Sequence, residues 1–387
     1  MCKNKFSVLL ILFMSFCFIQ ISFAAGTDKF KVKPVKKNKT EKFRIGYLEG
    51  GEYQMYPLVL RGIVNGLAEL GWVEKIDIPQ QKDKNDSSKI WHWISKNIKS
   101  DYIEFVDNAY WSSGWKSKLR KKNKSLIIKR LNKKKDIDLM IANGTWAGQD
   151  LANNEHSVPT IVCSTSNPVQ AKIIKSAEDS GFRHIHARVD PTRFQRQINL
   201  FHDIVGFKKL GIAYIDTVAG RSYAAVEDIE TMASQLGFEI ERCLLPDKVE
   251  GKQLVNMTVK CYRKLAEKVD AVYITIQTGV TLKTLPKIMA PLNAKEIPTF
   301  SQAGSNEVKH GVLLSISQAN YKYVSMFHAQ TIAKIFNGAA PGDLNQVFED
   351  PSKIAINIAE AEKIGFNPSV DILSAADEIY NEIEVEK

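Results

Sequence analysis

Short apolar runs alternate with amphipathic stretches along most of this chain. The runs at 137–142 and 160–163 are rich in branched aliphatic residues and too short for helices, so we expect two buried strands there. The stretch between them, 146–154, fits a short helix. Strand, helix and strand in this order predict two parallel neighbouring strands, because a crossover helix brings the chain back in the same direction.

The same alternation extends to both sides of this unit. Residues 58–70 repeat apolar positions on one helical face and end at Gly71, a usual helix terminator. A further set of strands and helices begins after Pro168. We therefore predict an α/β fold with two Rossmann-like lobes, each with a parallel sheet, joined by a hinge. The other strands are expected at 43–48, 102–106, 208–214, 238–243, 270–276, 298–300, 311–317 and 353–358, and the other helices at 223–236, 252–267, 281–292, 321–336 and up to 364.

Both lobes are expected to be discontinuous in sequence. A late strand and helix follow the second lobe, which indicates that the chain crosses back to the first. We expect lobe 1 to hold residues 43–188 with about 318–342, and lobe 2 to hold residues 189–317 with about 343–387.

The first 24 residues have the pattern of a secretory signal peptide. Lys3 and Lys5 precede an apolar run at 6–18, and Ser22-Phe23-Ala24 places small residues where a signal peptidase reads. The alternative is a membrane anchor that stays, although the run is short for a span of about 20 residues. We expect cleavage near Ala24, a periplasmic or otherwise exported mature chain, and a flexible basic tether at 25–42.

The formal net charge is +10, and the most basic stretch is 116–135, with eleven lysines and arginines and no acid. One interpretation is a patch for nucleic acid or a membrane surface. The other is a solvated helix that covers the sheet, with an apolar side formed by Leu119, Leu126, Ile127 and Leu131. For an exported chain we favour the helix and expect no nucleic-acid partner.

Cys163, Cys243 and Cys261 remain after removal of the signal segment, so a complete disulfide framework is excluded. A bridge between Cys243 and Cys261 is compatible with an oxidising compartment, and the sequence leaves it open. Metal-ligand spacings, GxGxxG after a strand, GxxxxGK[ST] and GxSxG are all missing from the sequence. We therefore expect no catalytic residues, no metal and no cofactor.

Small polar residues follow most of the predicted strands. In open parallel sheets, ligands bind beyond the carboxyl ends of the strands, so these turns are candidates for one shared cleft. The alternative is that Gly, Ser, Thr and Asn are simply the residues that turns use. The aromatic residues of the loop expected at 108–115 either stack on a ligand or cover an apolar patch. The candidate ligand-binding residues are Glu49, Tyr53, Trp111, Asn143, Thr145, Trp146, Ser164, Ser166, Asn167, Asp216, Ser222, Gln277, Thr278, Ser301 and Gln302.

Several segments carry a resemblance to a known family. RGIVNGLAELGWVE at 61–74, IDLMIANGTWAGQDLA, VPTIVCSTSNPVQAKII, KKLGIAYID and VDAVYITIQTGVTL resemble, in this order, ABC transporter substrate-binding proteins. That family includes tryptophan- and tyrosine-binding members with the type I periplasmic-binding-protein fold. The resemblance covers about 43–366, except 76–135. It implies a two-lobed exported receptor, expected to be a monomer, that closes on a small solute and presents it to an ABC permease in the inner membrane.

Two other functions stay open at this point. The same lobes serve ligand sensing in a partner of a membrane receptor, and an exported α/β enzyme acting on a small molecule is the second alternative. Neighbouring permease and ATPase genes favour transport, whereas a neighbouring kinase or chemoreceptor favours sensing. The missing catalytic constellation argues against the enzyme.

In three turns, this chain lacks the acidic residues that the family commonly has there. This chain has Ser166-Asn167-Pro168, Gln277-Thr278 and Ser301-Gln302-Ala303-Gly304 at those places. Carboxylates there suit the ammonium group of an amino acid, so their replacement by neutral groups favours a neutral or anionic solute, including one with a ring. We expect alanine at Asn167 or Gln277 to weaken binding and to leave thermal stability nearly unchanged.

Overall fold

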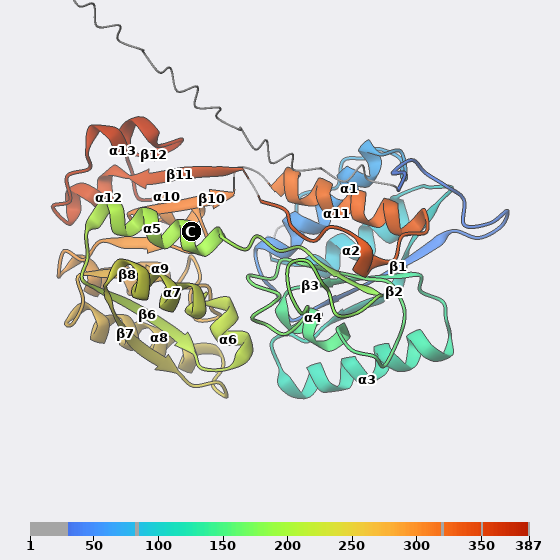
Figure 1. Ribbon diagram of the computed structural model, residues 1–387, viewed down its shortest axis with the longest axis horizontal. Helices are drawn as coiled ribbons and strands as arrows, with labels where there is room; N and C mark the ends of the chain where they lie inside the picture. The colour runs from blue at the N-terminus through green and yellow to red at the C-terminus, as the bar shows by residue number, and fades with distance from the viewer. Residues whose placement is uncertain (1–29, 82–84, 319–320, 350, 386–387) are drawn as a thin grey trace, which may run out of the picture.

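The computed structural model describes residues 30–81, 85–318, 321–349 and 351–385, and the signal peptide expected at 1–24 lies outside them. Two β-sheets, each with helices on both faces, form two lobes that lie side by side (Figure 1). The α/β fold with two lobes is confirmed. Among the described helices, none combines the length and the apolar character that crossing a bilayer requires.

The sheet of lobe 1 has the strand order β2-β1-β3-β4-β5 and is parallel throughout. Alternate residues of one strand face opposite sides: Ile45 and Tyr47 join one apolar core, and Leu48 joins the other. Burial of both faces is why these strands are nearly continuous apolar runs. The strands are β1 (Phe43–Glu49), β2 (Ile103–Ser112), β3 (Leu139–Asn143), β4 (Thr160–Cys163) and β5 (Ile185–Ala187). One face carries α1 (Met55–Glu69), α2 (Ser87–Asn97) and α11 (Tyr321–Phe336), and the other carries α3 (Ser117–Lys133) and α4 (Thr145–Leu151).

The sheet of lobe 2 has the strand order β12-β11-β10-β9-β8-β6-β7, and only the β10–β11 pair is antiparallel. Its strands are β6 (Lys209–Ile215), β7 (Glu239–Leu245), β8 (Ala271–Ile274), β9 (Thr299–Ser301), β10 (Leu314–Gln318), β11 (Ser352–Asn357) and β12 (Glu378–Tyr380). One face carries α5 (Arg193–Val205), α7 (Val226–Leu236), α12 (Ile358–Lys363) and α13 (Val370–Ala375). The other carries α8 (Gly251–Ala266), α9 (Leu285–Asn293) and α10 (Ser305–Lys309), and α6 (Val218–Tyr223) lies at the side facing lobe 1.

The chain passes between the sheets after β5, after β10 and after α11, by way of the 3-10 turn Pro341–Asp343. The first and last passages pair with each other: Val189 N donates to Gln346 O at 2.8 Å, and Phe348 N donates to Val189 O at 3.0 Å. These paired segments form the connection about which the lobes can rotate.

Helix α11 packs lengthwise on α1 in lobe 1, although it follows β10 of lobe 2 (Figure 1). The close approach requires a glycine, because a Cβ on Gly66 would lie 2.7 Å from Cβ of Ala329. A larger residue at position 66 would push the two helices apart.

The prediction of a flexible basic tether is wrong for residues 30–42. Phe30 and Val32 pack against the core of lobe 1, and Trp72 Nε1 donates to Val32 O at 2.8 Å. Lys37 Nζ donates to Asp138 Oδ1 at 2.8 Å. The apolar residues between the lysines attach this segment to the lobe.

The prediction of a loop beginning at 108 is also wrong, because β2 continues to Ser112. β2 is an edge strand, and Asp107 and Asn108 are exposed, so polar residues interrupt its apolar pattern. Trp111, proposed to meet the ligand, lies outside the cleft, with the guanidinium of Arg130 5.5 Å from the centre of its ring.

Two helical predictions need correction. Helix α5 was not predicted, although Phe194, Gln197, Ile198 and Phe201 form its buried side. The helix expected at 223–236 begins only at Val226, as α7, because Ala225 before it has a left-handed backbone with a φ of 52°. The separate short helix α6 ends at Tyr223.

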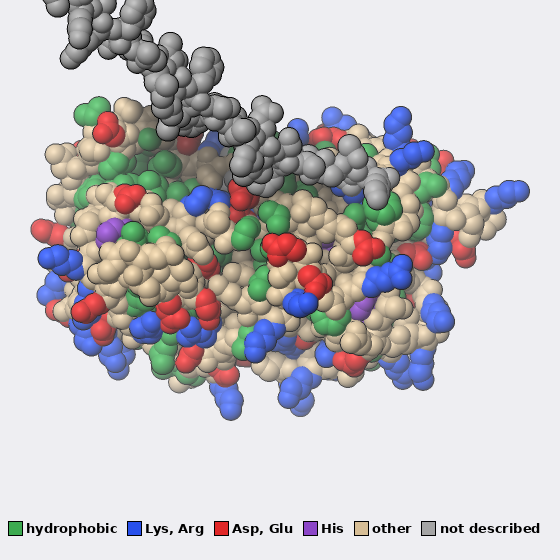
Figure 2. Space-filling view, viewed as in Figure 1, with side chains coloured by type: hydrophobic (Ala, Val, Ile, Leu, Met, Phe, Trp, Pro, Cys, Tyr) green, Lys and Arg blue, Asp and Glu red, His purple; other side chains and the backbone are tan. Residues whose placement is uncertain are grey.

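The basic stretch forms α3, a helix against the sheet, as favoured above. Only Ile127 and Leu131 of its four apolar residues are buried, whereas Leu119 and Leu126 are exposed. Its lysines point to solvent, and Figure 2 shows Lys and Arg side chains along the lower rim of the lobe where α3 lies.

Cys243 on β7 and Cys261 on α8 form a disulfide, with Cα atoms 5.6 Å apart. Cys163 is a buried free thiol at the end of β4. The bridge that the sequence left open therefore ties the edge strand of lobe 2 to the helix that covers it.

Candidate functional site

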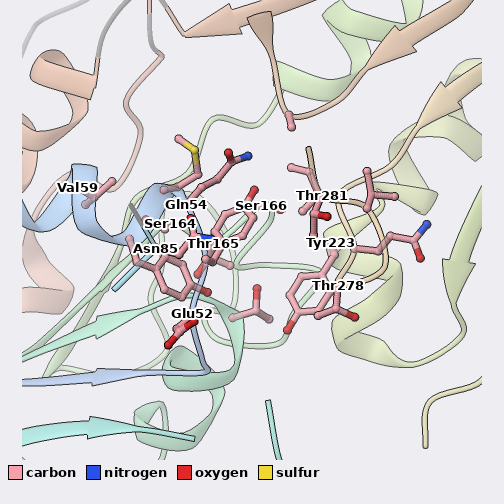
Figure 3. A pocket seen from close by; sticks show the side chains of 18 of the residues that line it. Glu52, Gln54, Val59, Asn85, Ser164, Thr165, Ser166, Tyr223, Thr278 and Thr281 are labelled. Atoms are coloured by element: carbon pink, nitrogen blue, oxygen red, sulfur yellow. The ribbon is translucent and has the colours of Figure 1, made fainter. Parts of the chain in front are cut away.

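A cavity of about 1020 Å³ lies between the lobes, at the carboxyl ends of the strands of both sheets. Its walls come from both lobes and from the passage after β5, which contributes Arg188. Arg193, at the start of α5, also lines the cavity. Figure 3 shows Gln54 and Ser164–Ser166 on one side, facing Tyr223, Thr278 and Thr281 on the other. The volume lies near the upper end of the range of small-molecule sites, about 300–1,000 Å³.

Six of the candidate residues line this cavity, and they come from both lobes. Tyr53, Thr145, Ser164 and Ser166 belong to lobe 1, and Gln277 and Thr278 belong to lobe 2. The turns after β3, β4 and β8 therefore meet at one place.

Glu49 and Asn143 are buried beneath the cavity and support its floor. Glu49 accepts hydrogen bonds from Tyr110 Oη at 2.8 Å and from Tyr47 Oη at 3.2 Å. Burial raises the pKa of Glu49 to about 7, and the neighbouring hydroxyl groups counteract part of that rise. Asn143 Nδ2 donates to Tyr47 Oη at 2.9 Å.

Ser301 and Gln302 also lie behind the wall. Ser301 Oγ donates to Glu307 Oε2 at 2.6 Å. Gln302 Nε2 donates to the carbonyl of Tyr223 at 2.8 Å, and Gln302 Oε1 accepts from Ile276 N at 2.7 Å. Gln302 therefore positions two segments that face the cavity and does not itself line it.

The two amides proposed for mutation have structural partners. Asn167 does not line the cavity, and its Oδ1 accepts from the backbone N–H groups of Val169 and Gln170, both at 3.1 Å. Gln277 lines the cavity, but its Nε2 donates to Ala213 O at 3.0 Å. The expectation that alanine leaves stability unchanged is therefore withdrawn for both residues.

Asp216 and Ser222 lie outside the cavity lining. Asp216 is exposed and lies 3.6 Å from Arg221, measured from Oδ1 to Nη1. Ser222 is buried, and its Oγ donates to the carbonyl of Asn167 at 2.9 Å, across the gap between the lobes.

An aromatic cluster, defined here as Tyr53, Tyr56, Trp115 and Trp146, covers the lobe 1 side. The ring centroids lie 5.3 Å apart for Tyr53–Tyr56, 6.4 Å for Tyr56–Trp115 and 5.4 Å for Trp115–Trp146. Trp146 does not line the cavity and supports Trp115 from behind. Tyr223 faces the cluster from lobe 2.

The twin glycines after β1 allow Trp115 to reach the cavity. A Cβ on Gly50 or Gly51 would lie within 2.7 Å of the Trp115 ring, and Trp115 Nε1 donates to Glu52 O at 2.9 Å. Trp115 and Ser164 both line the cavity with positive φ angles, 58° and 52°. Such strain costs roughly 1–3 kcal/mol per residue and concentrates at ligand sites.

The sequence did not single out Tyr56, Arg193, Tyr223 or His328, which all line the cavity. Tyr56 follows Tyr53 by one helical turn, a spacing that could have indicated a shared face. Tyr223 and Arg193 lie on helices that begin after a strand or a passage between lobes. Only the arrangement of the lobes brings them to the cleft.

Direct contacts hold the lobes together beside the cavity. Besides the Ser222–Asn167 bond, Gln170 Nε2 of lobe 1 donates to Asp228 Oδ2 on α7 at 3.0 Å. Burial raises the pKa of Asp228, and its amide neighbours act in the opposite direction. We call these two bonds the closure contacts.

Removing the closure contacts by the double substitution Ser222→Ala and Gln170→Ala is expected to raise the Kd for a bound solute about five- to a hundredfold. Each hydrogen bond contributes about 0.5–1.5 kcal/mol, and both contacts stabilise the arrangement in which the two walls face each other. Calorimetry measures the Kd, and small-angle scattering measures the radius of gyration, which should rise. Thr231→Ala, which removes a bond within α7, is the control. An unchanged Kd in the double variant would show that the contacts play no part in closure.

The region of the chain that the structure describes contains no group of three or more His, Cys, Asp or Glu residues able to hold a metal ion. Two lobes with a ligand-sized cavity between them define a bilobal solute-binding protein. The model of the ABC transporter substrate binding protein family matches residues 94–380, and the chain belongs to that family.

Individual relatives agree with this assignment. The chain is 22% identical over 294 residues to a tyrosine-binding protein of Clostridioides difficile (strain R20291), covering 73% of this chain and 81% of that protein. The solved ABC domain in complex with L-Trp from Streptococcus pneumonia has a TM-score of 0.65 at 20% identity, covering 88% of this chain and all of that chain (100%). A conserved domain protein from Vibrio cholerae gives 0.65 at 18% identity, with 88% and 100% coverage. The structural likeness shows the fold, and the predictions of family and fold are confirmed.

Proposed function

We propose that this protein is the exported solute-binding component of an ABC import system. It binds one small molecule between its lobes and delivers it to a membrane permease. The observation that carries the proposal is the cavity itself, since two lobes joined by paired connecting segments supply its walls. A ligand that touches both walls favours the closed arrangement by its differential affinity.

The chemistry of the lining supports binding without turnover. The walls combine aromatic rings with hydroxyl groups, the usual composition of sites that hold a small molecule by shape and a few hydrogen bonds. Glu52 is the one carboxylate among the described lining residues and is exposed. Glu49 and Glu307 are buried behind the lining and paired with hydroxyl groups. We therefore propose a receptor and not an enzyme, acting as a monomer outside the cytoplasm after removal of a signal peptide near Ala24.

A thermal-shift screen of amino acids, nucleosides and organic acids tests solute binding. At least one solute is expected to raise the melting temperature, to bind with one-to-one stoichiometry in calorimetry and to lower the radius of gyration. The bound solute is expected to be recovered unchanged after prolonged incubation. Chemical conversion of the solute would contradict the receptor function, and the lack of any stabilising solute would contradict solute binding.

Delivery to a permease needs a separate experiment. Adding the protein with labelled solute to vesicles that contain the permease and ATPase encoded beside its gene should produce ATP-dependent uptake. Uptake that does not depend on the protein would contradict a role in import.

A further inference from the structure

Arg193 is a cation in the cavity wall without an acidic partner. It is the first residue of α5, directly after the passage from lobe 1, and is half-buried. The neighbouring cations differ: Arg196 Nη2 lies 3.1 Å from Asp190 Oδ2, and Arg188 Nη2 lies 3.5 Å from the same atom. None of the described carboxylates forms an ion pair with Arg193, and its guanidinium carbon lies 5.2 Å from the centre of the Phe194 ring.

Arg193 lines the same cavity as the aromatic cluster. Tyr53 belongs to lobe 1 and α5 to lobe 2, so the two residues lie on different walls. Burial raises the pKa of the Tyr53 phenol, Tyr321 and Glu307 reinforce the rise, and the charge of Arg193 acts in the opposite direction. A ligand that touches Arg193 and the cluster would touch both lobes.

The other charges of the lining nearly cancel, so Arg193 sets its sign. Arg188 is paired with Asp190. Lys283 and Glu52, the one carboxylate among the described lining residues, are both exposed. Arg193 is half-buried, and a carboxylate matches the fork of a guanidinium with two parallel hydrogen bonds.

Some polar atoms of the lobe 1 wall have no hydrogen-bond partner within the described part of the chain. Ser164 Oγ, Thr165 Oγ1 and His328 Nδ1 are buried and make no hydrogen bond within the described part of the chain. All three residues line the cavity. Burial, reinforced by His186 and Arg188, lowers the pKa of His328 to about 3, so its ring is neutral at physiological pH. These groups offer hydrogen bonds to a polar ligand but no negative charge for an ammonium group.

We propose that the cleft binds a small aromatic carboxylate of net negative charge, that Arg193 pairs with its carboxylate, and that the aromatic cluster holds its ring. The inference rests on the proposed solute-binding function and specifies the ligand class. An amino group on the ligand adds nothing to the affinity, because Glu52, the one carboxylate among the described lining residues, is exposed to water.

A matched set of tyrosine analogues tests the ligand class. Desaminotyrosine carries the carboxylate alone, tyramine the ammonium alone, L-tyrosine both, and desaminotyrosine amide neither. Calorimetry is expected to show desaminotyrosine binding at least tenfold more tightly than its amide or tyramine, and no more weakly than L-tyrosine. Indolepropionate, its amide, tryptamine and L-tryptophan repeat the comparison with a larger ring.

Substitution of Arg193 tests the residue. Arg193→Gln is expected to weaken binding of the acid about ten- to a hundredfold and to leave binding of the amide unchanged, so that the preference disappears. Arg193→Lys should retain part of the preference. Arg242→Gln is the control, because Arg242 pairs with Glu230 on the outer side of lobe 2 and lies outside the cavity lining.

Three outcomes would overturn the inference: equal affinity for acid and amide, a preference that survives in Arg193→Gln, or L-tyrosine binding tenfold more tightly than desaminotyrosine. Failure of every acid to bind, while other solutes of the wider screen stabilise the protein, would also overturn it and leave solute binding intact. Only the lack of any stabilising solute in that screen would remove the proposed function itself.

Discussion

Replacing Gly144 by alanine is expected to lower the free energy of unfolding by about 2–4 kcal/mol and to abolish measurable solute binding. Gly144 precedes α4 with a φ of 94°, a conformation that costs an L-residue roughly 1–3 kcal/mol. A Cβ there would also collide with Oη and Cζ of Tyr56. Tyr56 would have to leave its place in the cavity wall, so stability and binding should fall together.

Two further variants distinguish the cost of backbone strain from the cost of the collision between the added Cβ and Tyr56. Gly206→Ala is the control for backbone strain, since Gly206 has a φ of 69° and no atom within 4 Å of its added Cβ. It should lose about 1 kcal/mol and keep its affinity. Tyr56→Phe in the Gly144→Ala background removes the colliding oxygen and should restore part of the stability in urea titrations. If Gly144→Ala binds its solute as the wild type does, Tyr56 does not form the wall as described.

Raising the pH from 6.5 to 8.5 is expected to remove about 1.6 kcal/mol of stability that Glu49 and Glu307 contribute together. Burial raises the pKa of both side chains to about 7, although hydrogen bonds from neighbouring hydroxyl groups act against the rise. In the unfolded chain a glutamate titrates near 4.3. The native state therefore holds extra protons, and their stabilising contribution is complete below the unfolded pKa and is lost as pH rises through 7.

The buried histidines also act within this pH window. Burial lowers the pKa of His156 and His186 to about 4 and that of His328 to about 3. In the unfolded chain a histidine titrates near 6.5 and is half protonated there, so each histidine adds about 0.4 kcal/mol of stability between pH 6.5 and 8.5. This gain is common to the wild type and to glutamate variants, so the difference between their pH profiles reports on the carboxyl groups.

Urea unfolding of the wild type and of the double variant Glu49→Gln and Glu307→Gln, at several pH values, measures this contribution. From pH 6.5 to 8.5 the wild type should lose about 1.6 kcal/mol relative to the double variant, whereas Glu239→Gln, at a side chain 80% exposed, should follow the wild type. Burial also raises the pKa of Glu360 to about 7, and its contribution is the same in all three proteins. Parallel pH profiles of the wild type and the double variant would contradict raised pKa values at Glu49 and Glu307.

Most strands were predictable because a strand that is buried on both faces of its sheet is a continuous run of apolar residues. β3 and β4 are short, continuous apolar runs, and their predicted positions differ from the observed ones by at most two residues. β2 was cut short because an edge strand mixes exposed Asp107 and Asn108 into the pattern. α5 was missed although it has helical spacing, because polar residues such as Gln197 occupy part of its buried side.

The place of the cleft was predictable, but the direction of individual side chains was not. The turns after β3, β4 and β8 reach the cavity, as expected for carboxyl ends of parallel strands. Whether a polar side chain there faces the ligand depends on its neighbours. Glu49 turns inward because two tyrosine hydroxyl groups meet it, and Gln302 does so because it bonds the backbone of Tyr223 and Ile276.

Arg193 could not be assigned from the sequence because its role depends on what is missing around it. Arg196 lies on the same helix and is neutralised by Asp190, whereas Arg193 has no such partner among the described residues. In the sequence Asp190 precedes both arginines and is nearer to Arg193, so sequence distance alone suggests the wrong partner. The difference arises from the path of the passage between the lobes.

The insertion of α11 into lobe 1 also sets the order in which the chain acquires its two cores. Phe43 near the start stacks on Phe336 of α11, with ring centroids 4.2 Å apart, and Trp72 lies 5.5 Å from the same ring. β6 to β9 of lobe 2 lie between these residues in sequence and pair without help from lobe 1. During synthesis, the apolar side of α1 therefore stays uncovered until α11 emerges. A nascent or half-translocated chain thus presents an aromatic-edged groove on lobe 1, the kind of surface to which holdase chaperones bind.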